Sequence, residues 1–257
     1  MPGSSILLIL TSFSYILPFS PFLNCYNISS LKKRAEAVFF LPSLLPYQPK
    51  ISISYSNPYG IRELSYTSLA FSYRKVGVGF INLGTGEINE KTVSLAFARQ
   101  LSTSQLGVSF YITRTQYEDI IKEHPGVRLG ITGDAAFFSY GFTLASRLDK
   151  YTPLFSSTFV FNENFGSTSV DLHMELYEAP CISFSQSFSF LPLFDIVIGL
   201  SQNPEALFLG LRTKGYISIS YSFREIGELG DTHSIGVEYT LGQNYNTSTT
   251  TEKGGMF

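Results

Sequence analysis

The chain has 257 residues, of which 15% are charged and 15% aromatic, and its formal net charge is −2. A typical soluble protein carries roughly 25% charged residues, so a soluble β domain with this composition would lack polar surface. The charge balance gives no sign of the clustered basic face that nucleic-acid binding needs.

Residues 1–24 are predicted to be a signal peptide or another apolar leader. The stretch from Ser4 to Leu23 carries no charge and is rich in Ile, Leu and Phe, as in the apolar core of an export signal. A basic n-region and an Ala-x-Ala cleavage site are missing, so an uncleaved anchor and an atypical leader stay open as alternatives.

Residues 25–50 form an N-terminal segment between the leader and the first strand. Good helix formers fill the range from Ser30 to Val38, and a proline-rich stretch follows it. We expect either a short periplasmic or plug helix here, or a linker. Cys25 in this segment and the distant Cys181 lack the spacing of metal ligands, so we expect no metal and either two free thiols or one bridge.

From residue 51 to residue 241 the chain is a series of strand-like runs of about 8 to 12 residues, the length of a tilted membrane strand. Turns rich in Gly, Pro and Asn separate the runs. We expect about fourteen strands, within a range of roughly 12 to 14, followed by a polar tail at 242–257. The predicted strands start near Ile51, Ser65, Val76, Lys91, Gln105, Val127, Tyr140, Pro153, Thr168, Cys181, Leu193, Ala206, Gly215 and Thr232.

The stretch from Thr92 to Thr113 shows the strand pattern most clearly. Apolar residues alternate with small or polar ones on both sides of a turn at 102–104, as expected for two strands of a hairpin. Its apolar face must meet either a protein core or lipid. Arg99 and Arg114 share this face near the strand ends, where a long side chain can reach lipid headgroups. The residues predicted to face lipid are Val93, Leu95, Phe97, Val108, Phe110 and Ile112.

Charged residues in the other strands occupy the register opposite the apolar one. In a membrane barrel this places them in a polar lumen, because a charge on the lipid face near the midplane costs roughly 2 to 4 kcal/mol. A soluble β-sandwich also alternates, but the large apolar residues and the scarcity of charge favour a membrane. The predicted lumen-lining residues are Arg128, Asp134, Arg147, Asp171, His173, Glu175, Asp195, Arg212 and Glu238.

Asp171, His173 and Glu175 form the row that most resembles a chemical site. Alternation places them on one polar face, with neighbours about 7 Å apart, close enough for one pair to share a cation. A lumen-lining row is the simpler interpretation. The sequence contains no hydrolase, metalloprotease, phosphate-loop or dinucleotide motif, so we predict no catalytic residue, no metal and no cofactor.

The segment from Ser234 to Leu241 resembles the assembly signal on the last strand of bacterial outer-membrane barrels. Gly236, Tyr239 and Leu241 occupy its glycine, aromatic and hydrophobic positions. This resemblance implies recognition by the barrel assembly machinery.

The range from Tyr55 to Ile112 resembles a known family through its runs YSNPYGIRELSYTSLAFSY, VGVGFINLG, TVSLAFARQL and LGVSFYI. These runs look like the PorV/PorQ-type outer-membrane proteins, which are related to the fatty-acid transporter (FadL-like) barrels. The resemblance extends loosely to Leu148 and rests on spacing and small residues. It implies a fourteen-stranded barrel that serves type IX secretion or passes hydrophobic compounds.

These observations predict an all-β protein, a monomeric antiparallel transmembrane β-barrel with a short N-terminal helical or irregular segment. We expect it in the outer membrane of a Gram-negative-type bacterium, as a non-enzymatic channel or transporter for small hydrophobic compounds. A secretion-associated scaffold for partner proteins is the alternative, and a secreted soluble β-sandwich is less favoured. The expected partners are outer-membrane lipid, the assembly machinery, and a small hydrophobic ligand or secreted proteins.

Overall fold

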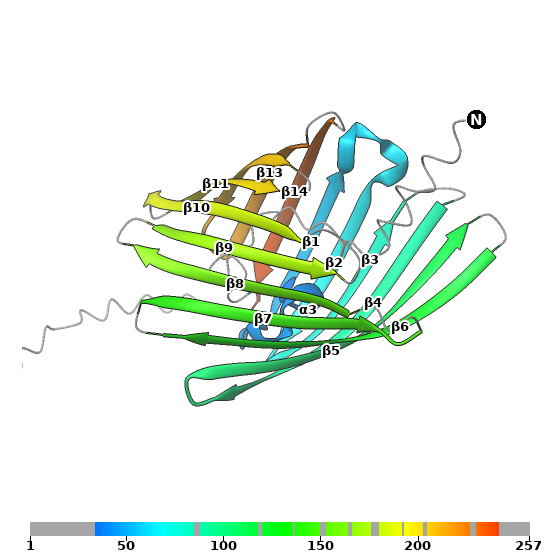
Figure 1. The fold of residues 1–257 in the computed structure, drawn as a ribbon, viewed down its shortest axis with the longest axis horizontal. Helices are drawn as coiled ribbons and strands as arrows, with labels where there is room; N and C mark the ends of the chain where they lie inside the picture. The colour runs from blue at the N-terminus through cyan, green and yellow to red at the C-terminus, as the bar shows by residue number, and fades with distance from the viewer. Residues whose placement is uncertain are drawn as a thin grey trace, which may run out of the picture.

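The computed structural model describes residues 34–84, 88–117, 120–135, 137–149, 153–163, 166–175, 180–191, 193–202, 205–226 and 230–241. Its main feature is one sheet of fourteen strands that closes into a barrel (Figure 1). The strands are β1 Lys50–Asn57, β2 Tyr66–Tyr73, β3 Val76–Leu83, β4 Ile88–Leu101, β5 Ser104–Tyr117, β6 Ile120–Asp134, β7 Phe138–Arg147, β8 Pro153–Glu163, β9 Gly166–Glu175, β10 Cys181–Leu191, β11 Phe194–Gln202, β12 Ala206–Thr213, β13 Ile217–Ile226 and β14 Gly230–Thr240.

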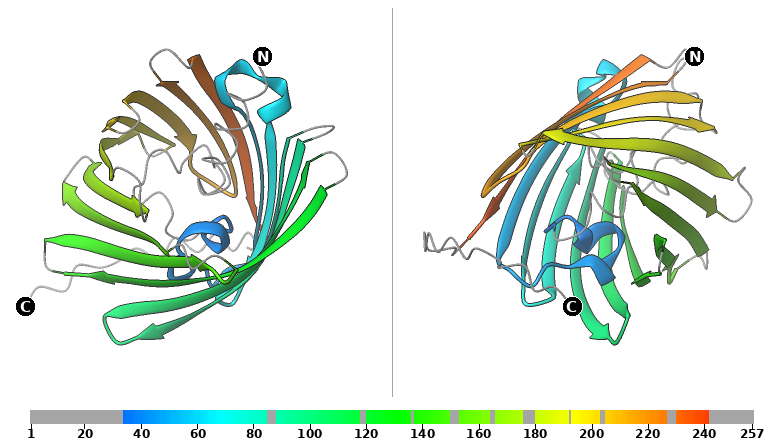
Figure 2. Two further views of the ribbon diagram at one scale, coloured as in Figure 1. Left: turned by 45° about the vertical axis from the view of Figure 1, so that its right-hand side comes forward. Right: turned by 90° about the vertical axis from the view of Figure 1, so that its left-hand side faces the viewer.

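The barrel closes because the last strand returns to the first. Every strand is antiparallel to its neighbours in the sequence, and β14 pairs with β1 from Lys50↔Thr240 to Asn57↔His233. Figure 2 shows the ring that results. A closed sheet satisfies its backbone groups without free edges, which is the requirement for spanning a bilayer with strands. The structure therefore confirms the predicted all-β, fourteen-stranded antiparallel barrel.

Helical structure is minimal in the part of the chain that the structure describes. A four-residue helix, α3 (Ala37–Phe40), and a 3₁₀ turn, η1 (Pro42–Leu44), precede the first strand, and two further 3₁₀ turns, η2 (Pro58–Gly60) and η3 (Arg62–Leu64), connect β1 to β2. Among the described residues, no helix is long and apolar enough to cross a membrane.

Side chains alternate between the inside and the outside of the barrel. Along β2, the side chains of Tyr66, Ser68, Ala70 and Ser72 are buried inside, whereas the residues between them are exposed outside. The period of two follows from the pleat of a strand. As a result the exterior is apolar, and the interior is lined mainly by serine, threonine, glycine and a few charged residues.

Three neighbouring strands are longer than the others. β4 and β5 have 14 residues each and β6 has 15, and β6 pairs with β7 only from Gly126 onward. The first residues of β6 therefore pair with β5 alone, and the three strands extend beyond the rim of the barrel on this side.

One predicted strand start was wrong. β6 begins at Ile120, seven residues before the predicted Val127, while every other strand starts within three residues of its prediction. Charges and a proline made 120–126 resemble a loop, but these residues pair with β5 where no apolar face is needed. In the N-terminal segment, where we expected a short helix or a linker, the described helix covers Ala37–Phe40, and positions 30–33 lie outside the described residues.

Candidate functional site

The interior of the barrel is occupied by residues 34–45 of the same chain, which we call the lumen segment. Figure 2 shows α3 and η1 enclosed by the ring of strands. The helix ends where Pro42 begins the 3₁₀ turn, because a proline cannot continue the hydrogen-bonding pattern of an α-helix. The large apolar side chains of the lumen segment are at most 6% exposed. They are Val38, Phe39, Phe40, Leu41, Leu44 and Leu45.

Glycines in the barrel wall make room for the lumen segment. A side chain at Gly79 would overlap the ring of Phe39, and one at Gly107 would overlap the backbone of Pro42 and Ser43. Gly77 and Gly130 also face this segment. The glycines of the VGVGF run are thus explained by close packing, and their partner is the N-terminal segment itself.

Hydroxyl groups of the wall bind the backbone of the lumen segment. The Ser94 hydroxyl donates to the carbonyl oxygen of Val38, and the Thr143 hydroxyl donates to that of Phe40, both at 3.4 Å. A short helix leaves its last carbonyl groups without internal partners. The polar wall residues therefore compensate for the burial of this short helix.

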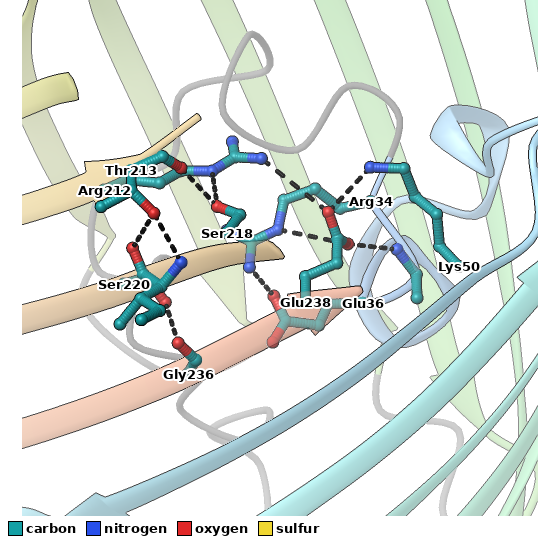
Figure 3. Close-up of polar contacts among 11 residues, drawn as sticks. Arg34, Glu36, Lys50, Arg212, Thr213, Ser218, Ser220, Gly236 and Glu238 are labelled. Carbon is teal, nitrogen blue, oxygen red and sulfur yellow. Dashed lines mark hydrogen bonds and ion pairs between the residues drawn. The ribbon is translucent and has the colours of Figure 1, made fainter. Parts of the chain in front are cut away.

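A carboxylate on the last strand joins the lumen segment to the barrel wall. Glu238 accepts a hydrogen bond from the Ala35 backbone N–H at 3.0 Å, and its Oε2 lies 3.8 Å from Arg34 Nε. Lys50 Nζ lies 2.8 Å and Arg212 Nη2 3.9 Å from Oε1 (Figure 3). The carboxylate is 2% exposed, so these contacts are weakly screened by solvent.

The same network spans the closing seam of the barrel. Lys50 begins β1 and Glu238 lies on β14, the two strands that close the ring. Arg34 also pairs with Glu36 at 2.9 Å, so the lumen segment contributes both a cation and an anion. Glu238 thus connects β1, β12, β14 and the lumen segment at one end of the barrel.

The predicted lumen-lining residues lie on the inner register, but they do not form one site. Arg212 and Glu238 belong to the network above, whereas Asp171 and His173 lie on β9 away from it. Asp134 and Asp195 lie at strand ends near the rim: Ser139 donates to Asp134, and Lys214 pairs with Asp195 at 2.7 Å. Glu175 ends β9, and its side chain is outside the described part of the structure.

Arg128 and Arg147 lie on neighbouring strands near Tyr111. Arg128 is 2% exposed, and its guanidinium carbon lies 5.4 Å from the centre of the Tyr111 ring, a cation–π geometry. Arg147, at the end of β7, binds Asp149 through Nε at 3.2 Å and Nη2 at 3.1 Å. His124 Nδ1 lies 2.5 Å from the same carboxylate, so Asp149 joins the β7–β8 connection to β6.

The pKa of Asp149 is low because of these partners. Partial burial opposes ionisation, but the hydrogen bonds and charges of Arg147 and His124 outweigh it and bring the pKa of Asp149 from 3.8 to about 2. A carboxyl group whose folded-state pKa is depressed stabilises the fold above its unfolded-state pKa. This contribution is lost as the pH falls from about 4 through 2.

We expect Asp149→Asn to destabilise the barrel at pH 7 by at most about 1 kcal/mol, since a partly exposed ion pair is screened by solvent. At pH 2, near the pKa of Asp149, about half of the carboxyl groups are protonated in the folded state and nearly all in the unfolded state, so most of the difference between the two proteins should be lost. Urea unfolding in detergent at both pH values measures this. An equal difference in unfolding free energy between the two proteins at pH 7 and pH 2 would contradict the low pKa of Asp149.

The outer surface carries a band of apolar side chains bounded by charges. Lys91 and Arg99 on β4 are eight positions apart, which is about 27 Å along the strand and roughly 20 Å along the axis of a barrel with a strand tilt of about 40°. Lys91, Arg114 and Glu123 are cross-strand neighbours at one boundary. This height approaches the roughly 25 Å apolar band of outer-membrane barrels.

The residues predicted to face lipid all lie on this outer surface. Five of them are exposed and Val108 is half-buried. They are Val93, Leu95, Phe97, Val108, Phe110 and Ile112. Tyr239 and Leu241 are also exposed outside, whereas Gly236 faces inward. Contact with lipid and the role of the last strand as an assembly signal stay predictions, and the tail at 242–257 lies outside the described residues.

Sequence comparison identifies no relative of this chain. No family model matches it, and no curated protein does so either. Among solved structures, it is similar to the outer membrane protein Omp33 of Acinetobacter baumannii, with a TM-score of 0.53 and 8% identity over 76% of this chain and 98% of that one. The fold is that of an outer-membrane β-barrel. The KdgM porin aligns with a TM-score of 0.46 and 9% identity over 75% of this chain and 99% of that one. A mutant of the Rh. blastica porin aligns with a TM-score of 0.47 and 6% identity over 75% of this chain and 98% of that one.

The sequence did not reveal the residues that hold the lumen segment. Arg34, Glu36 and Lys50 were part of the predicted N-terminal segment, but nothing in their spacing relates them to Glu238, about two hundred positions later in the chain. Gly107 and Gly130 are likewise single glycines in strands. An isolated glycine inside a strand does indicate close approach of another chain segment, and this was the available signal.

Proposed function

We infer that this protein is a porin-like channel of the outer membrane, with a lumen constricted by residues 34–45 of its own chain. The observation that carries this proposal is the closed barrel with an apolar band outside and a hydroxyl-lined, charged interior, since this division suits lipid on one side and water on the other. The likeness in fold to Omp33, described as an outer membrane protein, supports the same location.

The connections between strands give an orientation. Those at the end where β1 begins and β14 ends contain only two or three residues. Those at the opposite end range from two residues between β5 and β6 to the eight residues of 58–65, and three of them have four residues or more besides that longest one. Outer-membrane barrels have short turns on the periplasmic side and longer loops outside. The lumen segment and Glu238 would then lie toward the periplasm, with Asp149 toward the exterior.

The lumen segment acts as a fixed constriction in this proposal. Burying its six large apolar side chains contributes on the order of 10 kcal/mol before the entropy of ordering is subtracted. The contacts of Glu238 with Arg34 and Ala35 also hold the segment to the wall, so we expect it to stay in place while a solute passes. Passage beside it suits small solutes, and the serine and threonine rows of the wall favour polar ones.

Two other functions rest on particular observations. Small hydrophobic compounds are the class that the resemblance to PorV/PorQ-type and FadL-like proteins implies, and an internal N-terminal segment is compatible with it. A secretion-associated scaffold would need a surface beyond the apolar band, and the extension of β4, β5 and β6 offers one. The experiment below separates passage of polar solutes from both.

Gly107→Val is expected to raise permeability several-fold, because a side chain at this position overlaps the backbone of the lumen segment. Swelling of liposomes that contain the purified barrel, in isotonic solutions of sugars of increasing size, measures the effect. Gly210→Val is the matched control: Gly210 also faces the interior, but its nearest neighbour would be Val197 at 3.6 Å, an ordinary contact.

Heat-modifiable migration on a detergent gel shows that both variants are folded. Absence of sugar flux through the wild type and through folded Gly107→Val would refute the polar channel. Uptake of fatty acids without sugar flux would favour the hydrophobic class, and retention of secreted proteins without either flux would favour the scaffold.

A further inference from the structure

Asp171 is a fully buried carboxylate on the inner register of β9. It lies between Thr158 on β8 and Ser183 on β10, which are its cross-strand partners. The Ser169 and Ser183 hydroxyl oxygens lie 3.4 and 3.5 Å from Oδ2, and the Thr158 hydroxyl also reaches the carboxyl group. Four oxygen-bearing side chains from three strands therefore converge, and Asp171 itself is 0% exposed.

No positive side chain balances this carboxylate in the part of the chain that the structure describes. The ion pairs there involve Glu36, Asp149, Asp195 and Glu238, and none includes Asp171. Its Oδ1 atom accepts no hydrogen bond from the described residues. A buried and unpaired carboxylate costs several kcal/mol, so either a cation or a proton must neutralise it.

The distances around Asp171 suit ligands of a cation better than hydrogen bonds. A good O–H···O bond is about 2.7 Å long, shorter than the two contacts of Asp171 Oδ2. Two oxygen ligands at right angles around a cation with contacts of roughly 2.4 Å are about 3.4 Å apart. The Ser169 hydroxyl lies 2.5 Å from the Ser185 hydroxyl, so its proton can go to Ser185 while a lone pair stays free for a ligand.

We propose that Asp171, together with the hydroxyl groups of Thr158, Ser169 and Ser183, binds a monovalent metal cation, with sodium as the first candidate. Carboxylate and hydroxyl oxygens are ligands for hard cations. One carboxylate among neutral hydroxyls balances one positive charge, whereas a divalent ion would leave one uncompensated positive charge buried in the wall. The bound ion connects β8, β9 and β10 and stabilises this part of the wall, independently of any solute that the lumen passes.

The test compares the thermal midpoint of the folded barrel in sodium chloride and in N-methyl-D-glucamine chloride at equal ionic strength and pH. Because a ligand that binds only the folded state raises its stability, we expect a midpoint higher by a few degrees in sodium. Asp171→Asn should abolish this shift. Asp195→Asn is the matched control and should retain it, since Asp195 already pairs with Lys214 at 2.7 Å.

Two further measurements keep the proposal open to refutation if Asp171→Asn does not fold. Ser183→Ala keeps the carboxylate and removes one ligand, so it should reduce the sodium shift. Broadening of the ²³Na resonance by wild-type barrel, absent with Asp171→Asn or reduced with Ser183→Ala, reports binding directly. Equal thermal midpoints of the wild type in the two salts would overturn the proposal and would mean that a proton neutralises Asp171. A response to calcium but not to sodium would overturn the monovalent assignment.

Discussion

Glu238→Gln is expected to destabilise the barrel by about 3–5 kcal/mol, the usual cost of removing one partner of a buried ion pair. The change leaves Arg34, Lys50 and Arg212 with Glu36 as the remaining anion of the network. It also weakens the contact between β14 and β1 at the seam, where Lys50 Nζ lies 2.8 Å from the carboxylate. The midpoint of urea unfolding in detergent micelles measures the loss.

Glu225→Gln is the control for this prediction. Glu225 lies on β13, next to β14, and its side chain is exposed, so the same chemical change there should alter the free energy of unfolding by less than about 0.5 kcal/mol. A second readout follows from the geometry: loss of Glu238 should increase cleavage within the lumen segment by an added protease, because Arg34 and Ala35 lose their partner on the wall. Equal unfolding midpoints for both variants would show that the network does not stabilise the seam.

The barrel itself could be predicted from the sequence because its pattern is local. Alternation along each strand depends only on neighbouring residues. Arg128, Arg212 and Glu238 oppose the apolar register in the sequence and lie on the inner register of their strands in the structure. Strand starts followed from turn residues. β6 was the exception, because its first residues, around Lys122 and Pro125, pair with β5 beyond the apolar band and so need no alternation.

A plug helix in the N-terminal segment was one of the expected alternatives, but the contacts that hold it could not be predicted, because they join distant parts of the chain. Phe39 packs against Gly79, Ser43 against Gly107, and Arg34 contacts Glu238; no local pattern specifies these pairings. The extent of the helix could not be predicted either: among the described residues before β1 it covers Ala37–Phe40, since the lumen segment is shaped by the wall around it more than by helix propensity.

Two separate features of the sequence, the glycines of the wall and the apolar residues of the lumen segment, have one physical explanation. Glycine weakens a strand, since it has no side chain to pack and loses more entropy on folding. In this barrel the cost is offset where Gly79 and Gly107 allow an apolar segment to approach the backbone of the wall. The run of small residues in β3 and the apolar residues after Arg34 are therefore two halves of a single interface.

Because Phe110 points outward, we expect a large effect of Phe110→Arg on folding into a bilayer. Phe110 is 54% exposed on β5 and its cross-strand neighbours are Leu95 and Val127, so Phe110→Arg places a charge within the apolar band at a cost of roughly 2–4 kcal/mol. We expect a reduced yield of heat-modifiable barrel on folding into lipid vesicles, while folding into detergent micelles, which deform around a charge, suffers less.

Leu101→Arg is the matched control, since Leu101 is also exposed outside but ends β4 at the edge of the band, where an arginine reaches the headgroups. Ser109→Arg is unsuitable as a control, because Ser109 is fully buried on the inner face next to Arg128 and a second arginine there would be overpacked and repelled. A larger loss of folded barrel in vesicles for Phe110→Arg than for Leu101→Arg would show that the outer face contacts lipid. Equal yields of Phe110→Arg and Leu101→Arg in vesicles would place this face against something other than a bilayer.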